Sequence, residues 1–197
     1  MKDLTTDKTR IATEIIDIPR RRFVSGTGGL TLSAAAVALL GGAPRLALRA
    51  GEAGGADITI LNGAIAAELQ AIAAYQVGAE SGLLGQDAKR LALQFQGHHR
   101  SHADLLRGTV MQLGATPAEA RDHYDFPVDQ LKNEADVLRF AAGLERDAVS
   151  AYLGAVPQFA DRALAKAAAS ILGDEAMHWA VLRYVLGEDP VPAAFVS

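Results

Sequence analysis

Residues 173–179, Gly-Asp-Glu-Ala-Met-His-Trp, set Glu175 and His178 three positions apart in an Ala-rich run with helical periodicity. Side chains at positions i and i+3 leave the same face of a helix, about one turn apart. An isolated Glu-x-x-His pair arises by chance in many helices. It therefore predicts a metal site only where other helices bring matching groups to it.

The chain beyond Gly55 has no alternating strand pattern and contains four long segments rich in Ala and Leu. They predict helices over residues 57–81, 87–113, 133–156 and 161–186, with Asp57 as the N-cap of the first. The first and second segments are joined by few residues, as are the third and fourth, so each pair should form an antiparallel hairpin. Residues 115–132 can span the length of a helix, which predicts a long crossover between the hairpins.

The two predicted hairpins repeat each other in sequence. A core-facing stripe with one Glu and a Tyr seven residues later occurs in the first segment and again, 77 residues further on, in the third. The second and fourth segments align at an offset of 76, so that His102 corresponds to His178 and His99 to Glu175. This agreement indicates a duplicated site.

Six ionisable side chains then lie at one depth in the predicted core: Glu68, His99, His102, Glu145, Glu175 and His178. A buried carboxylate is costly unless it is paired, protonated or bound to metal. Two divalent cations would satisfy the cluster, with carboxylates bridging and imidazoles binding terminally. The alternative is a hydrogen-bonded Glu/His network left from a lost site. Tyr75 and Tyr152 are predicted to hydrogen-bond to the carboxylates as core residues, and no catalytic residue is assigned.

These residues resemble the ferritin-like di-metal family, in which two helices each give a Glu and two others each give a Glu-x-x-His. The resemblance covers about residues 57–187 and is closest to exported ferritin-like domain proteins with twin-arginine signals. It implies an all-α fold, a ferritin-like four-helix bundle of two helical hairpins joined by a long crossover and preceded by a signal segment. Where the family has a Glu, this chain has His99.

His99 changes the charge of the predicted site. Four carboxylates balance two divalent ions, whereas three leave about one extra positive charge, which favours the reduced M(II) state. Imidazole also cannot bridge two metals as a carboxylate does. Two iron ions remain the first expectation for the cofactor, with manganese, zinc or a single metal as alternatives.

Composition separates a basic head from an acidic body. Residues 1–50 carry eight Lys/Arg against four Asp/Glu, while residues 51–197 carry eleven against nineteen. The acidic body argues against a nucleic-acid partner. The absence of Cys from the 197 residues excludes disulfides and thiolate metal ligands.

The basic head contains Arg20-Arg21-Arg22-Phe23-Val24, followed by a short apolar run over residues 26–40. This pattern resembles a twin-arginine export signal, with Arg20 and Arg21 as the pair. We expect a signal over residues 1–53, a bundle over 54–190 and a tail over 191–197. The chain would then be exported to the periplasm or another extracytoplasmic space, or remain membrane-anchored if the signal is not cleaved.

Three functions fit these observations. The first is a two-metal enzyme that reacts with O2 or peroxide, the second a non-enzymatic metal-binding or sequestration module, and the third a structural bundle. The predicted partners are metal ions, the twin-arginine export machinery and a second copy in a homodimer. His98 is expected to face solvent beside the six-residue cluster, and Trp179 to seal a helix interface. His123 is expected to lie on the surface, with a secondary metal role as the alternative.

Overall fold

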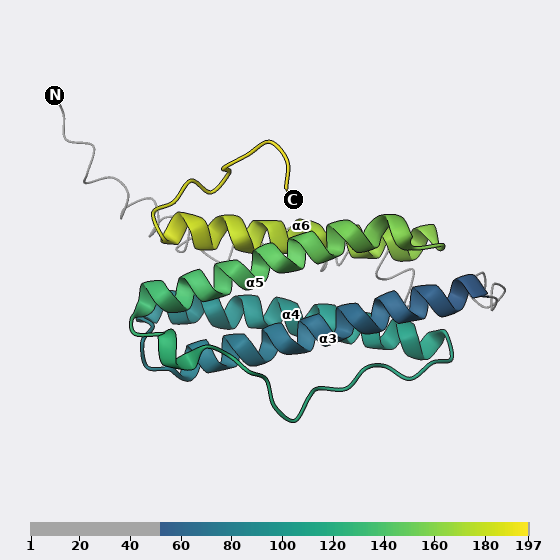
Figure 1. The fold of residues 1–197 in the computed structure, drawn as a ribbon, viewed down its shortest axis with the longest axis horizontal. Helices are drawn as coiled ribbons and strands as arrows, with labels where there is room; N and C mark the ends of the chain where they lie inside the picture. The colour runs from purple at the N-terminus through teal and green to yellow at the C-terminus, as the bar shows by residue number, and fades with distance from the viewer. Residues whose placement is uncertain (1–51, 197) are drawn as a thin grey trace, which may run out of the picture.

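Four long helices form two antiparallel hairpins in the part of the chain that this computed structural model describes, residues 52–196. Helix α3 (Glu52–Glu80) pairs with α4 (Gln86–Gln112), and α5 (Glu134–Ala155) pairs with α6 (Arg162–Val185). The short 3-10 turns η3 (Val128–Gln130) and η4 (Val156–Gln158) precede and follow α5. Figure 1 shows the two hairpins side by side, with the crossover running along the bundle. The predicted all-α architecture is confirmed, and the signal predicted over residues 1–53 lies almost wholly outside the described residues.

The ends of the helices follow local side-chain chemistry. Asn133 caps α5 by accepting a hydrogen bond from the backbone N–H of Asp136, and Asp161 caps α6 by accepting from the two residues that follow Arg162. Gly114 and Gly187 stand just beyond α4 and α6 with φ of 78° and 76°. A left-handed residue of this kind ends a helix at least cost when it is glycine.

Asp57 does not cap the first helix, because α3 begins five residues earlier, at Glu52. Its buried carboxylate instead accepts hydrogen bonds from the backbone N–H groups of Ala160 (2.8 Å) and Asp161 (3.0 Å). These groups lie at the start of α6, where the helix dipole favours a negative charge. Asp57 thus joins the first helix to the last, and the sequence-based assignment was wrong because the cap acts on a distant helix.

Replacing Asp57 by Ala should lower the free energy of unfolding by about 1–3 kcal/mol, since two partly buried hydrogen bonds lose their acceptor. Urea denaturation followed by circular dichroism measures the change. Asp87→Ala is the control, because the Asp87 side chain is 65% exposed and its ion pair with Arg90 lies on the surface. An equal loss of stability in both variants would contradict the role of Asp57.

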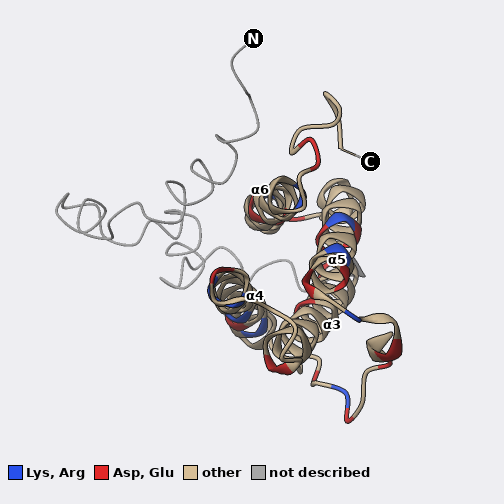
Figure 2. Cartoon of the chain, turned by 90° about the vertical axis from the view of Figure 1, so that its left-hand side faces the viewer, with Lys and Arg blue, Asp and Glu red and all other residues tan. Residues whose placement is uncertain are grey.

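The crossover is fastened to the bundle at both of its ends. The Asn62 side chain donates to the carbonyl of Thr116 and accepts from the N–H of Ala118. Near the other end, the ring of Phe126 contacts Phe140 of α5 edge-on, with centroids 5.8 Å apart. Viewed along the bundle in Figure 2, the crossover lies on the side of α3 and α5, while α4 and α6 lie together on the other side.

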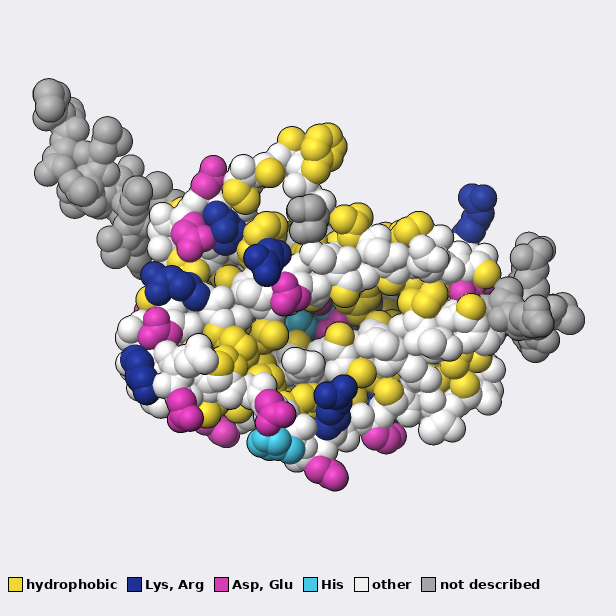
Figure 3. All heavy atoms as spheres, in the orientation of Figure 1, with side chains coloured by type: hydrophobic (Ala, Val, Ile, Leu, Met, Phe, Trp, Pro, Cys, Tyr) yellow, Lys and Arg dark blue, Asp and Glu magenta, His cyan; other side chains and the backbone are white. Residues whose placement is uncertain are grey.

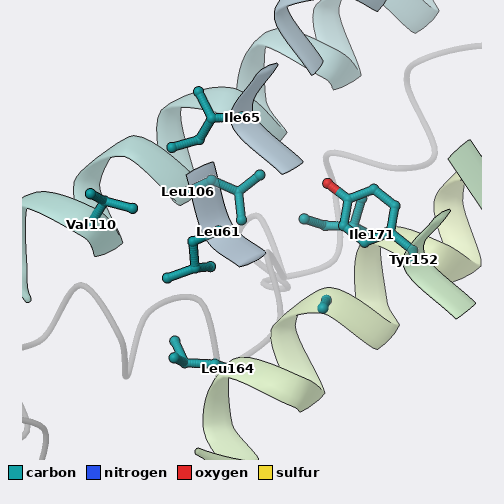
Figure 4. Packing of buried hydrophobic residues seen from close by; sticks show 8 residues of the cluster. Leu61, Ile65, Leu106, Val110, Tyr152, Leu164 and Ile171 are labelled. Atoms are coloured by element: carbon teal, nitrogen blue, oxygen red, sulfur yellow. The ribbon is translucent and has the colours of Figure 1, made fainter. Parts of the chain in front are cut away.

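Two apolar clusters fill the bundle core. One contains Leu61, Ile65, Leu106, Val110, Tyr152, Leu164, Ala168 and Ile171, most of which Figure 4 labels. The other contains Tyr75, Ala88, Ala92, Phe95, Leu138, Ala141, Ala142 and Leu182. Helical spacing along the four segments predicts most of these core residues. It also predicts a core position for Val185, at the end of the stripe that runs from Leu164 through Glu175, but this side chain is 37% exposed. The predicted cluster of ionisable residues lies along the same stripes, between the apolar positions.

Helix α3 is also apolar and long enough over Gly54–Glu80 to cross a membrane by length and composition. In this structure it packs as a bundle helix. Leu61 and Ile65 are buried in the core, and Glu68 of the same face is 2% exposed.

Candidate metal centre

The structure brings all six predicted groups together in the middle of the bundle. Glu68 comes from α3, His99 and His102 from α4, Glu145 from α5, and Glu175 and His178 from α6. Five of the side chains are at most 3% exposed, and that of His102 is 13% exposed. Figure 3 shows histidine and acidic side chains at the bottom of a hollow between the hairpins, bordered by hydrophobic groups.

The six side chains form two overlapping groups, each compact enough to hold one metal ion. The first contains Glu68, His99, His102 and Glu175, and the second contains His99, Glu145, Glu175 and His178. Within each group the potential ligand atoms all lie within 4.8 Å of one another. His99 and Glu175 belong to both groups and therefore lie at the centre of the site.

His99 uses a different ring nitrogen toward each group. Its Nδ1 lies 2.8 Å from Oε2 of Glu68, and its Nε2 lies 3.3 Å from Oε1 of Glu145. A neutral imidazole has one lone pair and one N–H, so it can bind a metal on only one of these sides. A protonated His99 would instead donate to both carboxylates.

The two tyrosines link the hairpins reciprocally. Tyr152 of α5 donates to Oε1 of Glu68 on α3 at 2.5 Å, and Tyr75 of α3 donates to Oε1 of Glu145 on α5. Burial and the neighbouring carboxylates raise the pKa of both hydroxyls well above the ordinary value. Each tyrosine therefore stays a proton donor that fixes the orientation of one carboxylate.

Two residues outside the predicted set complete the cluster, His98 and Asp174. Oδ2 of Asp174 lies 3.2 Å from Nε2 of His178 and 3.3 Å from Nε2 of His102. A carboxylate on the outer nitrogen orients an imidazole so that Nδ1 faces the metal. The sequence held a signal for this role, because Asp174 directly precedes Glu175 and so lies beside the ligand face of α6.

His98 lies beside the cluster, as predicted, but it contacts the cluster as well as solvent. Its side chain is 39% exposed, but Nδ1 lies 3.1 Å from Asp174 and 2.8 Å from Nε2 of His178. The sequence repeat pairs His98 with Asp174 at the offset of 76, and this correspondence could have identified it. His123 is 79% exposed and pairs with Asp125, as expected for a surface residue, and Trp179 packs at the edge of an apolar cluster.

The neighbouring carboxylates raise the proton affinity of the buried imidazoles. Burial lowers the pKa of His99, but hydrogen bonds to Glu145 and Glu68 outweigh it and raise the pKa to about 9. Burial also lowers the pKa of His178 and of His102, but hydrogen bonds to Asp174 first, and then to the glutamates, raise both pKa values to about 11. Burial raises the pKa of Glu68 and of Glu145, but their histidine partners lower both below the ordinary value. Without metal, the cluster is therefore held together by imidazolium–carboxylate pairs.

The metal-free protein should lose stability as the pH rises through about 9 to about 11. A group whose pKa is higher in the folded than in the unfolded state stabilises the fold fully below the unfolded value and loses this effect above the folded value. Urea denaturation at pH 7, 9 and 10.5 in the presence of a chelator measures the change. His102→Gln should show a shallower decline, and equal slopes in both proteins would contradict the assignment.

Three buried atoms in the described residues have no hydrogen-bond partner: Nδ1 of His102, Oε2 of Glu145 and Oε1 of Glu175. Two of them, on His102 and Glu175, lie 3.1 Å apart without the geometry of a hydrogen bond. Buried polar atoms without a hydrogen bond are costly, and one cation in each of the two groups would satisfy all three. The donor set, made only of nitrogen and oxygen, fits a divalent metal such as iron, manganese or zinc.

Two hairpins, a long crossover and a buried Glu/His cluster define a ferritin-like protein. The family model described as the ferritin-like domain matches residues 56–188, and the chain belongs to this family. A comparison with curated proteins found no match.

Several solved structures share the fold. A conserved hypothetical protein from Mycobacterium tuberculosis is 27% identical with a TM-score of 0.63, over 73% of this chain and 99% of that one. A dodecameric thioferritin, the bacterioferritin-related protein of Bacteroides fragilis, is 24% identical with a TM-score of 0.58, over 68% and 86%. A ferritin-like diiron-carboxylate protein of Bacillus anthracis is 22% identical with a TM-score of 0.60, over 69% and 99%. The last two likenesses concern the fold alone.

Proposed function

We propose that this protein binds two divalent metal ions, iron first among them, in the buried centre, and that the loaded centre reacts with O2 or peroxide. The observation that carries the proposal is that three buried atoms make no hydrogen bond: one on His102 in the first group, one on Glu145 in the second, and one on Glu175, which both groups share. In a cluster that served only as a hydrogen-bonded network, most buried polar atoms would have a hydrogen-bond partner.

The residues of the chain have distinct parts in this proposal. Glu68 and His102 would hold one ion, Glu145 and His178 the other, and Glu175 would be shared between them. The two tyrosines fix the carboxylates from outside, and Asp174 fixes the two terminal imidazoles. When bound, the metal supplies the redox chemistry, which none of these side chains provides alone.

A second candidate function, metal sequestration without turnover, is favoured by His99. This residue stands at the position shared by both groups and offers a lone pair to only one of them. A site with one carboxylate fewer also favours the reduced state of its metals. Tight binding with slow or absent oxidation is the expected behaviour under this alternative.

Elemental analysis of the protein purified without a His tag tests the proposal first. Anaerobic addition of Fe(II), followed by exposure to oxygen or peroxide, then separates the two functions. Two bound metals with rapid oxidation support the reactive centre, while bound metal without turnover supports sequestration. A folded protein that takes up no iron, manganese or zinc would contradict both.

We also propose that the domain is exported after folding. This proposal rests on the pair Arg20 and Arg21 and on the apolar run over residues 26–40 that follows it. Fractionation of cells that produce the full chain tests this. The double variant Arg20→Lys/Arg21→Lys should accumulate in the cytoplasm. Unchanged export of that variant would overturn the proposed route. A homodimer remains a prediction, to be measured by light scattering.

A further inference from the structure

A second group of ligand atoms lies just outside the buried centre, between α4 and α6. It consists of His98, Asp174 and the outer nitrogen of His178. The side chains of His98 and Asp174 are 39% and 25% exposed, whereas that of His178 is 2% exposed. The group therefore extends from the protein surface to the edge of the centre.

The three atoms form a compact triangle. Nδ1 of His98 lies 2.8 Å from Nε2 of His178 and 3.1 Å from Oδ2 of Asp174. The third side, from Nε2 of His178 to Oδ2 of Asp174, is 3.2 Å. Ligands on a tetrahedral metal with bonds of about 2.0–2.2 Å lie ~3.3–3.6 Å apart. A movement of a few tenths of an ångström would open this triangle to hold a cation and leave one position for water.

His178 belongs to both the outer group and the buried centre, through opposite nitrogens. Nε2 faces His98 and Asp174, while Nδ1 lies 3.2 Å from Oε2 of Glu175 and 3.5 Å from Oε1 of Glu145. A neutral imidazole binds metal through one nitrogen and carries a proton on the other. Metal at the outer group therefore excludes binding of His178 to the inner one, and the reverse. The outer group would be a transient position, vacated when the centre fills.

We propose that His98, Asp174 and Nε2 of His178 form an outer divalent-metal site, which captures the cation at the α4–α6 face and passes it to the buried centre. The delivery step rests on the proposed function, while the outer site itself does not. Figure 2 shows why this face is distinct, since the crossover lies on the opposite side of the bundle, along α3 and α5. Because these ligands are partly exposed, a hydrated ion can bind there while it loses its water ligands one at a time to the protein side chains.

Equilibrium binding of Co(II) to a chain with a disabled centre tests the outer site. In the full chain without a His tag, Glu68→Gln/Glu145→Gln removes two inner carboxylates and leaves the outer triangle. This variant should bind about one Co(II), with the intense visible absorption of a tetrahedral site. Adding His98→Ala should weaken that binding at least ~tenfold. Adding His123→Ala instead, at an exposed histidine paired with Asp125, is the matched control and should change nothing.

The outer site is overturned if the folded double variant binds no Co(II), or if His98→Ala and His123→Ala have equal effects. Should the double variant not fold, the loading rate of the otherwise unchanged protein decides. His98→Ala should then slow Co(II) uptake by ~tenfold with the same final stoichiometry. Equal rates would place the access route elsewhere, such as the hollow between α3 and α5 in Figure 3. A wild-type centre that binds nothing contradicts the proposed function but leaves the test on the double variant intact.

Discussion

Replacement of Glu145 by Gln is expected to abolish metal binding at the second of the two ligand groups. The carboxylate lies 3.3 Å from Nε2 of His99 and 3.5 Å from Nδ1 of His178, and it accepts a hydrogen bond from the hydroxyl of Tyr75. An amide preserves the size of the side chain but removes the negative charge that a divalent ion requires. Affinity should fall by more than the ~10–100-fold that loss of an outer-shell partner costs.

The same change should destabilise the metal-free protein, because two buried imidazolium groups lose a partner. Breaking a buried ion pair costs about 3–5 kcal/mol. Glu119→Gln is the matched control, since the Glu119 side chain is 73% exposed and forms an ion pair with Arg107. Metal content after dialysis and urea denaturation measure the two effects. Glu145→Asp should retain part of both, and metal content equal to that of the wild type in the Gln variant would remove Glu145 from the site.

The bundle was predictable from the sequence because its determinants are local and repeated. Asn133 and Asp161 cap the helices that follow them, and Gly114 and Gly187 end the helices that precede them. Each of these effects acts within one helical turn. The buried face of each helix follows from the spacing of its apolar residues. The long connection between the hairpins can run the length of the bundle, and this predicts the ferritin-like order of the four helices. Asp57 shows the limit of such reasoning. Its hydrogen-bond partners are 103 and 104 residues away in the sequence, and the helical spacing of residues around Asp57 gives no indication of them.

The outer part of the cluster escaped prediction for a different reason. His98 and Asp174 lie one position before the predicted ligands on their helices, on a flank that helical spacing places partly in solvent. Which flank faces the partner helix depends on how α4 and α6 pack against each other, which no single helix encodes. The sequence repeat did contain the information, since His98 and Asp174 are equivalent positions that the fold brings within 3.1 Å.

Replacement of His99 by Glu should produce the largest gain of function in this chain. The equivalent position in the repeat is Glu175, which sits at the same depth of α6 with a fully buried side chain, so the bundle accommodates a Glu there. A carboxylate at position 99 can bridge two ions, whereas a neutral imidazole can bind only one. We expect the second metal to bind at least ~tenfold more tightly and Fe(II) oxidation to accelerate by a similar factor, because each lost bridging ligand costs at least as much as an outer-shell partner.

Two controls separate the bridging role of a carboxylate from simple removal of the imidazole. His99→Gln removes the imidazole without adding a charge and should bind metal no better than the wild type. His123→Glu makes the same exchange at an exposed position and should leave binding and oxidation unchanged. If His99→Glu binds no more metal and oxidises Fe(II) no faster than the wild type, the imidazole does not limit the centre. If binding tightens without faster oxidation, the centre is built for holding metal, and sequestration becomes the function that its residues support.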